Sequence, residues 1–173
     1  MRPSLLLPPA MPALAGLEVP RDFYWVLAAP APLAGMVFPR GPARWAEMQA
    51  AGFRHVVCLT NETFPYAPVP LNALAAVALM DLYGGLQPPA PAAEQEQIWR
   101  VAGLVRARLE QGEGVVVHCA GGTGRTGTVI GCVLRGLGYP VGEVVDYLNR
   151  LHQSRGRAGW PESPWQAEVV AGL

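Results

Sequence analysis

A thiol and a guanidinium stand six positions apart in the stretch HCAGGTGRTG, residues 118–127. The segment between Cys119 and Arg125 reads Ala-Gly-Gly-Thr-Gly, so it carries no bulky side chain. Its glycines can adopt positive φ and let the backbone curl tightly, which turns successive N–H groups inward as a nest for an anion. A guanidinium offers a planar fork that matches two phosphoryl oxygens. The spacing therefore predicts that Cys119 and Arg125 surround a phosphate group.

The flanking elements are expected to place this loop at the edge of a sheet. The run VVVHC predicts a buried strand that ends at Cys119, and a helix is predicted to begin near Arg125 or Thr126. Ligands of open α/β sheets bind beyond the carboxyl ends of strands, where a helix N-terminus adds free N–H groups and a positive dipole end. That field favours the thiolate of Cys119, and the Thr126 hydroxyl can donate a hydrogen bond to the sulfur. The expected phosphate-binding residues are Ala120, Gly121, Gly122, Thr123, Gly124 and Arg125.

Other glycine-rich loops fit this stretch less well. A Walker A loop needs a Lys-Ser/Thr pair, but all 13 basic residues of the chain are arginine. Residues 122–127, GTGRTG, have the spacing of a dinucleotide-binding fingerprint, which leaves Cys119 and Arg125 without a purpose. We interpret only Cys58 and Cys132 as purely structural cysteines, because both lie in apolar runs.

Composition predicts a folded protein in a reducing compartment. The chain has 173 residues, of which 51% are hydrophobic and 15% charged, enough for the core of one domain. A formal net charge of zero gives no field that attracts nucleic acid or a membrane, and no apolar run reaches the roughly 20 residues of a membrane span. Three cysteines without paired spacing favour a cytoplasmic location. We expect a proline-rich N-terminal segment over residues 1–20 and one domain over residues 21–173, with no cofactor and no metal.

Apolar periodicity predicts alternating strands and helices along the domain. A helix with Pro42 near its start and Gly52 past its end follows the first two strands. A mobile loop is expected from Asp81 to Pro91. The alternation predicts an α/β fold, a single-domain layer sandwich with a largely parallel central sheet flanked by helices. The expected strands cover residues 23–29, 36–39, 55–60, 77–80 and 115–119, and the expected helices cover residues 41–52, 92–114, 126–138, 141–156 and 163–173.

Residues 118–127 resemble the signature of a known family. HCAGGTGRTG matches the H-C-x-x-G-x-G-R-[ST]-G signature loop of cysteine-dependent protein tyrosine and dual-specificity phosphatases, and the small dual-specificity-like subgroup is nearest in size. The resemblance implies that the signature loop lies between a strand and a helix. It also implies that Cys119 attacks phosphorus and forms a phosphocysteine, while His118 orients the loop.

The resemblance extends to two further loops. Asp81, in MDLYGGLQPP and 38 positions before Cys119, resembles the family's general acid, although Leu82 and Tyr83 separate it from the glycines. Tyr83 is the next candidate, with a pKa near 10 that suits acid–base work poorly at neutral pH. In ESPWQ, Gln166 resembles the glutamine that positions the hydrolytic water. The implied catalytic set is therefore Cys119, Arg125, Asp81 and Thr126, supported by His118 and Gln166.

The sequence predicts an enzyme that hydrolyses phosphomonoesters. Among such enzymes it favours a protein tyrosine phosphatase, and it leaves dual specificity open. The expected partner is a phosphorylated protein or a small phosphomonoester substrate, with no nucleic acid and no membrane, and the sequence favours no oligomeric state. Two alternatives remain: a catalytically weak phosphate-binding module, or pseudophosphatase, and an inositol phosphate or phosphoinositide phosphatase. The uncharged interior of the signature loop disfavours the last of these. A thiol redox or sulfur-transfer protein would leave Arg125 and the glycines with little purpose.

Overall fold

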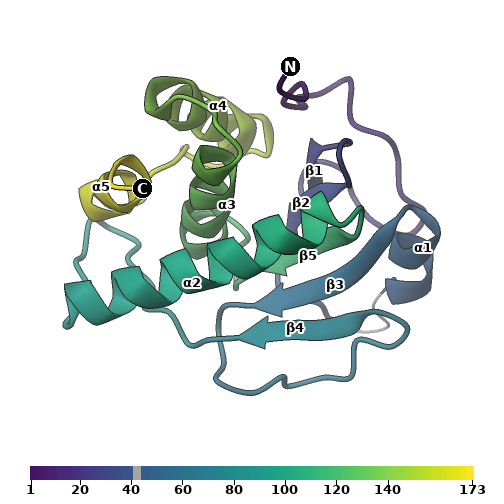
Figure 1. Cartoon of the computed structure of the whole chain (residues 1–173), viewed down its shortest axis with the longest axis horizontal. Helices are drawn as coiled ribbons and strands as arrows, with labels where there is room; N and C mark the ends of the chain where they lie inside the picture. Colours follow the sequence, from purple (N-terminus) through teal and green to yellow (C-terminus); the bar gives the residue numbers. More distant parts are fainter. Residues whose placement is uncertain (41–43) are drawn as a thin grey trace.

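A single mixed sheet organises the computed structural model, which describes residues 1–40 and 44–173. Within these residues the strand order is β1-β2-β5-β3-β4 (Figure 1). Strands β1 and β2 pair antiparallel, whereas β2 with β5, β5 with β3 and β3 with β4 pair parallel. The predicted α/β fold with a largely parallel sheet is therefore confirmed. The strands are β1 (Phe23–Leu27), β2 (Leu33–Met36), β3 (Phe53–Cys58), β4 (Asn72–Ala76) and β5 (Gly114–His118).

Strand β5 is the centre of the sheet and carries the signature loop at its end. Its residues Val115 to Val117 are fully buried, as expected of a parallel strand covered on both faces. The register places His118 beside Met36 of β2 and beside Cys58 of β3. The carboxyl ends of three parallel strands therefore meet at one edge, which is where ligands bind in open α/β sheets.

Helices cover both faces of this sheet. The helices are α1 (Trp45–Ala50), α2 (Pro91–Glu110), α3 (Gly124–Gly136), α4 (Val141–Ser154) and α5 (Pro164–Ala171). The larger core joins α2, α3, α4 and α5 to one face of the sheet, and the smaller core joins α1 to the other face (Figure 1). Such a layered arrangement buries the apolar stripe of each helix against the sheet.

Helix α3 is the best-buried helix, and two of its glycines permit that position. A Cβ on Gly127 would come within 2.6 Å of the Trp160 ring, and a Cβ on Gly131 would come within 2.8 Å of Val170. The segment after α4 and the helix α5 therefore pack directly against the α3 backbone. This close packing holds the end of the chain beside the signature loop.

The proline-rich residues 1–20 lie against β1 and α4. The Leu6 amide donates to the Val26 carbonyl at 3.0 Å, and the Tyr147 hydroxyl donates to the Leu6 carbonyl at 2.8 Å. The Trp25 indole N–H donates to the Pro12 carbonyl at 2.9 Å. These bonds satisfy backbone groups of a segment that forms no helix or strand of its own.

Two predicted strands are displaced. The strand expected at residues 77–80 is wrong, because the alanine-rich Asn72–Ala76 pairs with β3 instead. The following residues continue along the end of β3 with single bonds, from the Val77 amide to the Cys58 carbonyl and from the Leu79 amide to the Leu59 carbonyl. The strand expected at residues 36–39 lies at Leu33–Met36, since Val37 turns to bond Asp22. The prediction for Pro42 falls outside the described residues.

Candidate active site

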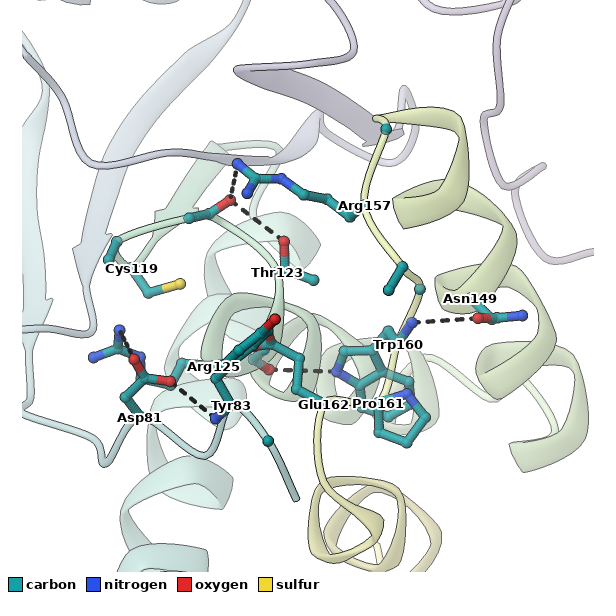
Figure 2. A pocket seen from close by; sticks show the side chains of 17 residues that line it. Asp81, Tyr83, Cys119, Thr123, Arg125, Asn149, Arg157, Trp160, Pro161 and Glu162 are labelled. Carbon is teal, nitrogen blue, oxygen red and sulfur yellow. Dashed lines mark hydrogen bonds and ion pairs between the residues drawn. The ribbon is translucent and has the colours of Figure 1, made fainter. Parts of the chain in front are cut away.

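The predicted phosphate loop lines a cavity of about 760 Å³ at the carboxyl edge of the sheet (Figure 2). Cys119 follows β5 directly, and Arg125 is the second residue of α3. In Figure 2 the Cys119 sulfur points into the space enclosed by the labelled side chains. The rest of the wall comes from Asp81, Tyr83 and Gly84, from Asn149 of α4, and from the segment that links α4 to α5. From the loop itself the lining residues are Cys119, Ala120, Gly121, Thr123, Gly124 and Arg125.

Outward hydrogen bonds hold the loop in the shape of a cup. The carbonyl of Ala120 accepts from the Phe38 amide at 2.9 Å, that of Gly121 from Arg155 at 3.0 Å, and that of Gly122 from the Tyr24 hydroxyl at 2.6 Å. In a trans peptide the N–H points opposite to the C=O. The next three amides, those of Gly121, Gly122 and Thr123, therefore face away from this scaffold and toward the cavity.

Only one loop glycine uses a positive φ. Gly122 has φ of 71°, whereas the Gly121 and Gly124 positions, for which the sequence also allowed positive φ, do not adopt it. A Cβ on Gly122 would in addition lie 2.7 Å from the Met36 carbonyl oxygen. Both backbone conformation and space therefore require glycine at position 122.

Arg155 is a buried cation that the sequence analysis did not single out. It is 4% exposed, and its guanidinium donates to the carbonyls of Gly121 and Gly122 and to the Thr123 hydroxyl. Its plane also lies 4.4 Å from the centroid of the Tyr24 ring. Burial lowers the pKa of this guanidinium, which nevertheless remains charged at neutral pH. Arg155 therefore acts as a positioning residue beneath the loop, on the side away from the cavity.

His118 is neutral and fixes the start of the loop. It is fully buried, and burial lowers its pKa to about 4. Its Nδ1 lies 3.1 Å from the Cys119 carbonyl and its Nε2 contacts the Tyr66 hydroxyl. A carbonyl can only accept, so Nδ1 carries the proton and Nε2 accepts from Tyr66. This contact is consistent with the role implied for His118, orientation of the signature loop.

The structure brings Asp81 to the same cavity as the thiol. Its Oδ2 lies 4.0 Å from Nη2 of Arg125, whose Nη1 also donates to the Leu79 carbonyl at 3.4 Å. The Asp81 side chain is 65% exposed, and its other oxygen accepts from the Tyr83 amide at 3.0 Å. The loop that carries it is therefore ordered by its own carboxylate, which resembles an Asx turn.

Two predicted residues take unexpected positions. Thr126 is fully buried, and its hydroxyl has no hydrogen-bond partner within residues 1–40 and 44–173, so the bond expected to the Cys119 sulfur is not formed. Gln166 is 1% exposed and is absent from the lining of the main cavity. Its Oε1 accepts from the Glu162 amide at 2.8 Å. Gln166 thus supports the segment that faces the cavity.

Two charged residues of the cavity were missed by the sequence analysis. The Arg157 guanidinium reaches the Gly121 carbonyl at 3.5 Å. The Glu162 carboxylate lies so close to Gly124 that a Cβ there would overlap its oxygen. Burial raises the pKa of Glu162, as does the charge of Asp81, while Arg125, Arg157 and the Gly124 amide oppose the rise. Glu162 belongs to the stretch ESPWQ, so its closeness in sequence to Gln166 was the one signal that could have identified it.

No group of three His, Cys, Asp or Glu side chains in the described part of the chain is arranged to hold a metal ion. No helix in residues 1–40 and 44–173 is long and apolar enough to span a membrane.

Comparisons with known proteins agree with this geometry. The model of the Swiss Army Knife protein DSP-PTPase phosphatase domain matches residues 20–158. The crystal structure of Tk-PTP in its active form is similar, with a TM-score of 0.57 and 24% identity over 82% of this chain and 90% of that chain. P. aeruginosa TpbA in complex with phosphotyrosine has a TM-score of 0.56 and 16% identity over 91% of this chain and 93% of its own.

A third structure, the core catalytic domain of the PP-IP phosphatase SIW14 from S. cerevisiae, has a TM-score of 0.54 and 15% identity over 80% of this chain and 78% of its own. Identities this low support the shared fold alone. The family model, in contrast, spans most of the chain and includes the whole signature loop. The chain therefore belongs to the DSP-PTPase phosphatase family of Swiss Army Knife proteins, a branch of the cysteine-dependent tyrosine phosphatases.

Proposed function

We propose that this protein hydrolyses phosphomonoesters through a phosphocysteine at Cys119 and that phosphotyrosine in proteins is its main substrate. The observation that carries the proposal is the cup itself. Three loop carbonyls are bonded outward, so the amides opposite them face a cavity that holds both the thiol and Arg125. Such a preorganised set of donors stabilises the charge on the equatorial oxygens of a transferring phosphoryl group.

The first step forms the phosphocysteine. The thiolate of Cys119 attacks phosphorus in line with the leaving oxygen, the new S–P bond forms, and the P–O bond of the ester breaks. Arg125 and the loop amides hold the three remaining oxygens. Asp81 protonates the departing phenol or alcohol, since its carboxyl group lies beside Arg125 at the mouth of the cavity. In the second step water attacks the phosphocysteine and releases inorganic phosphate.

The walls of the cavity favour a phenyl phosphate. Pro161 and Ala158 give the cavity exposed apolar surface, which suits the face of an aromatic ring. The interior of the signature loop, Ala-Gly-Gly-Thr-Gly, adds no charge besides Arg125. One structure of similar fold, TpbA, contains phosphotyrosine. Phosphoserine and phosphothreonine are shorter, and we expect them to be slower substrates.

One observation favours a second candidate, an inositol polyphosphate or phosphoinositide phosphatase. Arg157 lines the cavity and provides a second cation for a substrate with several phosphates. A structure of similar fold is titled a PP-IP phosphatase. The two candidates differ in the second anion of the substrate, so Arg157→Ala should weaken turnover of inositol polyphosphates much more than turnover of phosphotyrosine peptides.

Turnover of p-nitrophenyl phosphate tests the activity. We expect release of p-nitrophenolate in the presence of EDTA, inhibition by vanadate, and loss of turnover in Cys119→Ser, since an unactivated hydroxyl is a poor nucleophile. Cys58→Ser is a matched control, because the Cys58 sulfur already lies 3.4 Å from the Thr60 hydroxyl and outside the cavity lining. Tight binding of a phosphotyrosine peptide without release of phosphate would instead identify a pseudophosphatase.

A further inference from the structure

We propose that Glu162 is the base that takes the proton of the attacking water in the second step. This inference rests on the proposed function and extends it to a residue beyond the segment that the family model matches, residues 20–158. The sequence resemblance implied that Asp81, after acting as the acid, takes this proton from a water that Gln166 positions, and we assign the proton to Glu162 instead.

Glu162 lies on the cavity side of Gln166. Both side chains approach the same point above Gly124, where an added Cβ would be 3.0 Å from Cδ of Glu162 and 3.0 Å from Nε2 of Gln166. Glu162 lines the cavity together with Cys119, and Gln166 does not. Figure 2 shows Glu162 among the labelled side chains that face this space, together with Asp81 and Arg125. A water that attacks a phosphocysteine in this cavity would therefore meet a carboxylate before it met the buried amide.

The backbone of Glu162 is held on both sides. Its amide donates to Oε1 of Gln166 at 2.8 Å, and its carbonyl accepts from the Gly85 amide at 3.0 Å. The next residue, Ser163, donates its hydroxyl to the Leu86 carbonyl at 2.6 Å. Gln166 is thus a positioning residue that orients the segment carrying the carboxylate. A group held in this way meets the geometric requirement for proton transfer better than a freely rotating one.

The charges around Glu162 suit a base. The groups that face it are Asp81 on the loop before α2, Arg125 on α3 and Arg157 after α4. Burial and the Asp81 charge raise the pKa of Glu162, which makes its carboxylate a stronger proton acceptor than a solvated one. Asp81 is the more exposed of the two carboxyls, at the mouth of the cavity, which suits protonation of a bulky leaving group. The two carboxyls therefore divide the acid and base roles between the two steps.

The second step forms one bond to phosphorus and breaks another. The water oxygen forms a bond to phosphorus, and the P–S bond breaks with its electron pair on sulfur, which regenerates the Cys119 thiolate. The proton lost by the water moves to the Glu162 carboxylate. Glu162 releases this proton to solvent or to the departing phosphate. Asp81, which gave its own proton to the leaving group in the first step, takes one up from solvent, so the enzyme is restored.

Stopped-flow kinetics of Glu162→Gln with p-nitrophenyl phosphate test the proposal. We expect a burst of one p-nitrophenolate per active site at the wild-type rate, because p-nitrophenolate leaves without an acid and the first step is intact. The steady-state rate should then fall about 100-fold, the usual contribution of a general base. Glu168→Gln, at an exposed position of α5, is the matched control and should leave both phases unchanged.

The pH profile provides a second readout that a structural role would not move. A base must be ionised, so the steady-state rate of the wild type should rise with pH through the pKa of Glu162, and this limb should be absent in Glu162→Gln. A steady-state rate near the wild-type value would overturn the proposal, as would a burst slowed by the same factor as the steady state. Absence of any p-nitrophenolate from the wild-type protein would instead refute the proposed function.

Discussion

Replacement of Arg155 by methionine tests whether the outward hydrogen bonds shape the phosphate cup. Methionine has comparable length and fills the buried site, but it donates no hydrogen bond. The substitution removes the bonds to the loop carbonyls of Gly121 and Gly122, and those to the carbonyls of Pro20 and Arg21. Gly122 keeps the hydroxyl of Tyr24, so three carbonyls lose their main donor.

The expected loss of stability follows from these three acceptors. A buried acceptor left without a partner costs about 1–3 kcal/mol, and the lower end applies here because the bonds to these three carbonyls are only partly buried. Removal of the buried charge offsets part of that sum, since burial of Arg155 is itself unfavourable, as its lowered pKa indicates. We expect the free energy of unfolding to fall by about 3 kcal/mol, measured by urea denaturation. Arg150→Met, on the exposed side of α4 with one ion pair to Asp146, should change it by less than about 0.5 kcal/mol.

The activity of the same variant should fall as well. Without Arg155 the carbonyls of the loop lose their anchor, and the amides behind them no longer converge on one point. A displacement of about 1 Å at a reacting centre costs on the order of 100-fold in rate. We expect that loss in kcat/KM for p-nitrophenyl phosphate and a weaker inhibition constant for vanadate. If Arg155→Met matched Arg150→Met in both stability and vanadate binding, the scaffold argument would be refuted.

Three further predictions follow from single contacts. Gly124→Ala should lower kcat at least 10-fold by displacing the Glu162 carboxylate, whereas Gly103→Ala, with open space around an added Cβ on α2, should leave kinetics unchanged and stabilise the helix by about 0.5–1 kcal/mol. His118 has a folded pKa of about 4, below its unfolded value of 6.5, so the unfolded chain binds this proton first as pH falls. About 3 kcal/mol of stability should therefore be lost between pH 6.5 and pH 4, and denaturation at a series of pH values should show a shallower slope for His118→Gln. Asp81→Asn should slow turnover of phenyl phosphate about 100-fold and that of p-nitrophenyl phosphate much less, and equal effects on both would contradict its role as the acid.

The signature loop was predictable because its information is local. Buried valines before Cys119 and a helix after Gly124 fix the direction of the loop, and the spacing of thiol and guanidinium then specifies its chemistry. The amphipathic pattern of residues 92–114 predicted α2, which the structure places at Pro91–Glu110. In both cases the residues that decide the structure are within one or two turns of each other.

The strand at Asn72–Ala76 could not be placed from the sequence. Four of its five residues are alanine or leucine, which favour a helix, and only the pairing with β3 makes the segment extended. The prediction therefore placed the strand on the β-branched Val77, which instead follows the strand. Tertiary pairing overrides local propensity here.

Arg155 and Glu162 were missed for a related reason. Each lies 30 or more residues from the loop it contacts, and apart from the closeness of Glu162 to Gln166 in the sequence nothing nearby distinguishes either residue from a solvated charge. Arg155 becomes buried only because the end of α4 meets the chain near Pro20 and Gly121. Glu162 reaches Gly124 only because α5 packs on the α3 backbone. Both contacts are products of helix packing, which a periodicity argument does not describe.

The hydrogen bonds from Gly85 to Glu162 and from Ser163 to Leu86 join residues 81–86 to residues 160–163. Outward movement of one segment must carry the other with it or break both bonds, at about 1 kcal/mol each. Admission of a substrate would then withdraw the carboxyl groups of Asp81 and Glu162 together. Their joint return would bring both groups beside the bound phosphoryl group at once, so a single motion would assemble the groups that serve both steps.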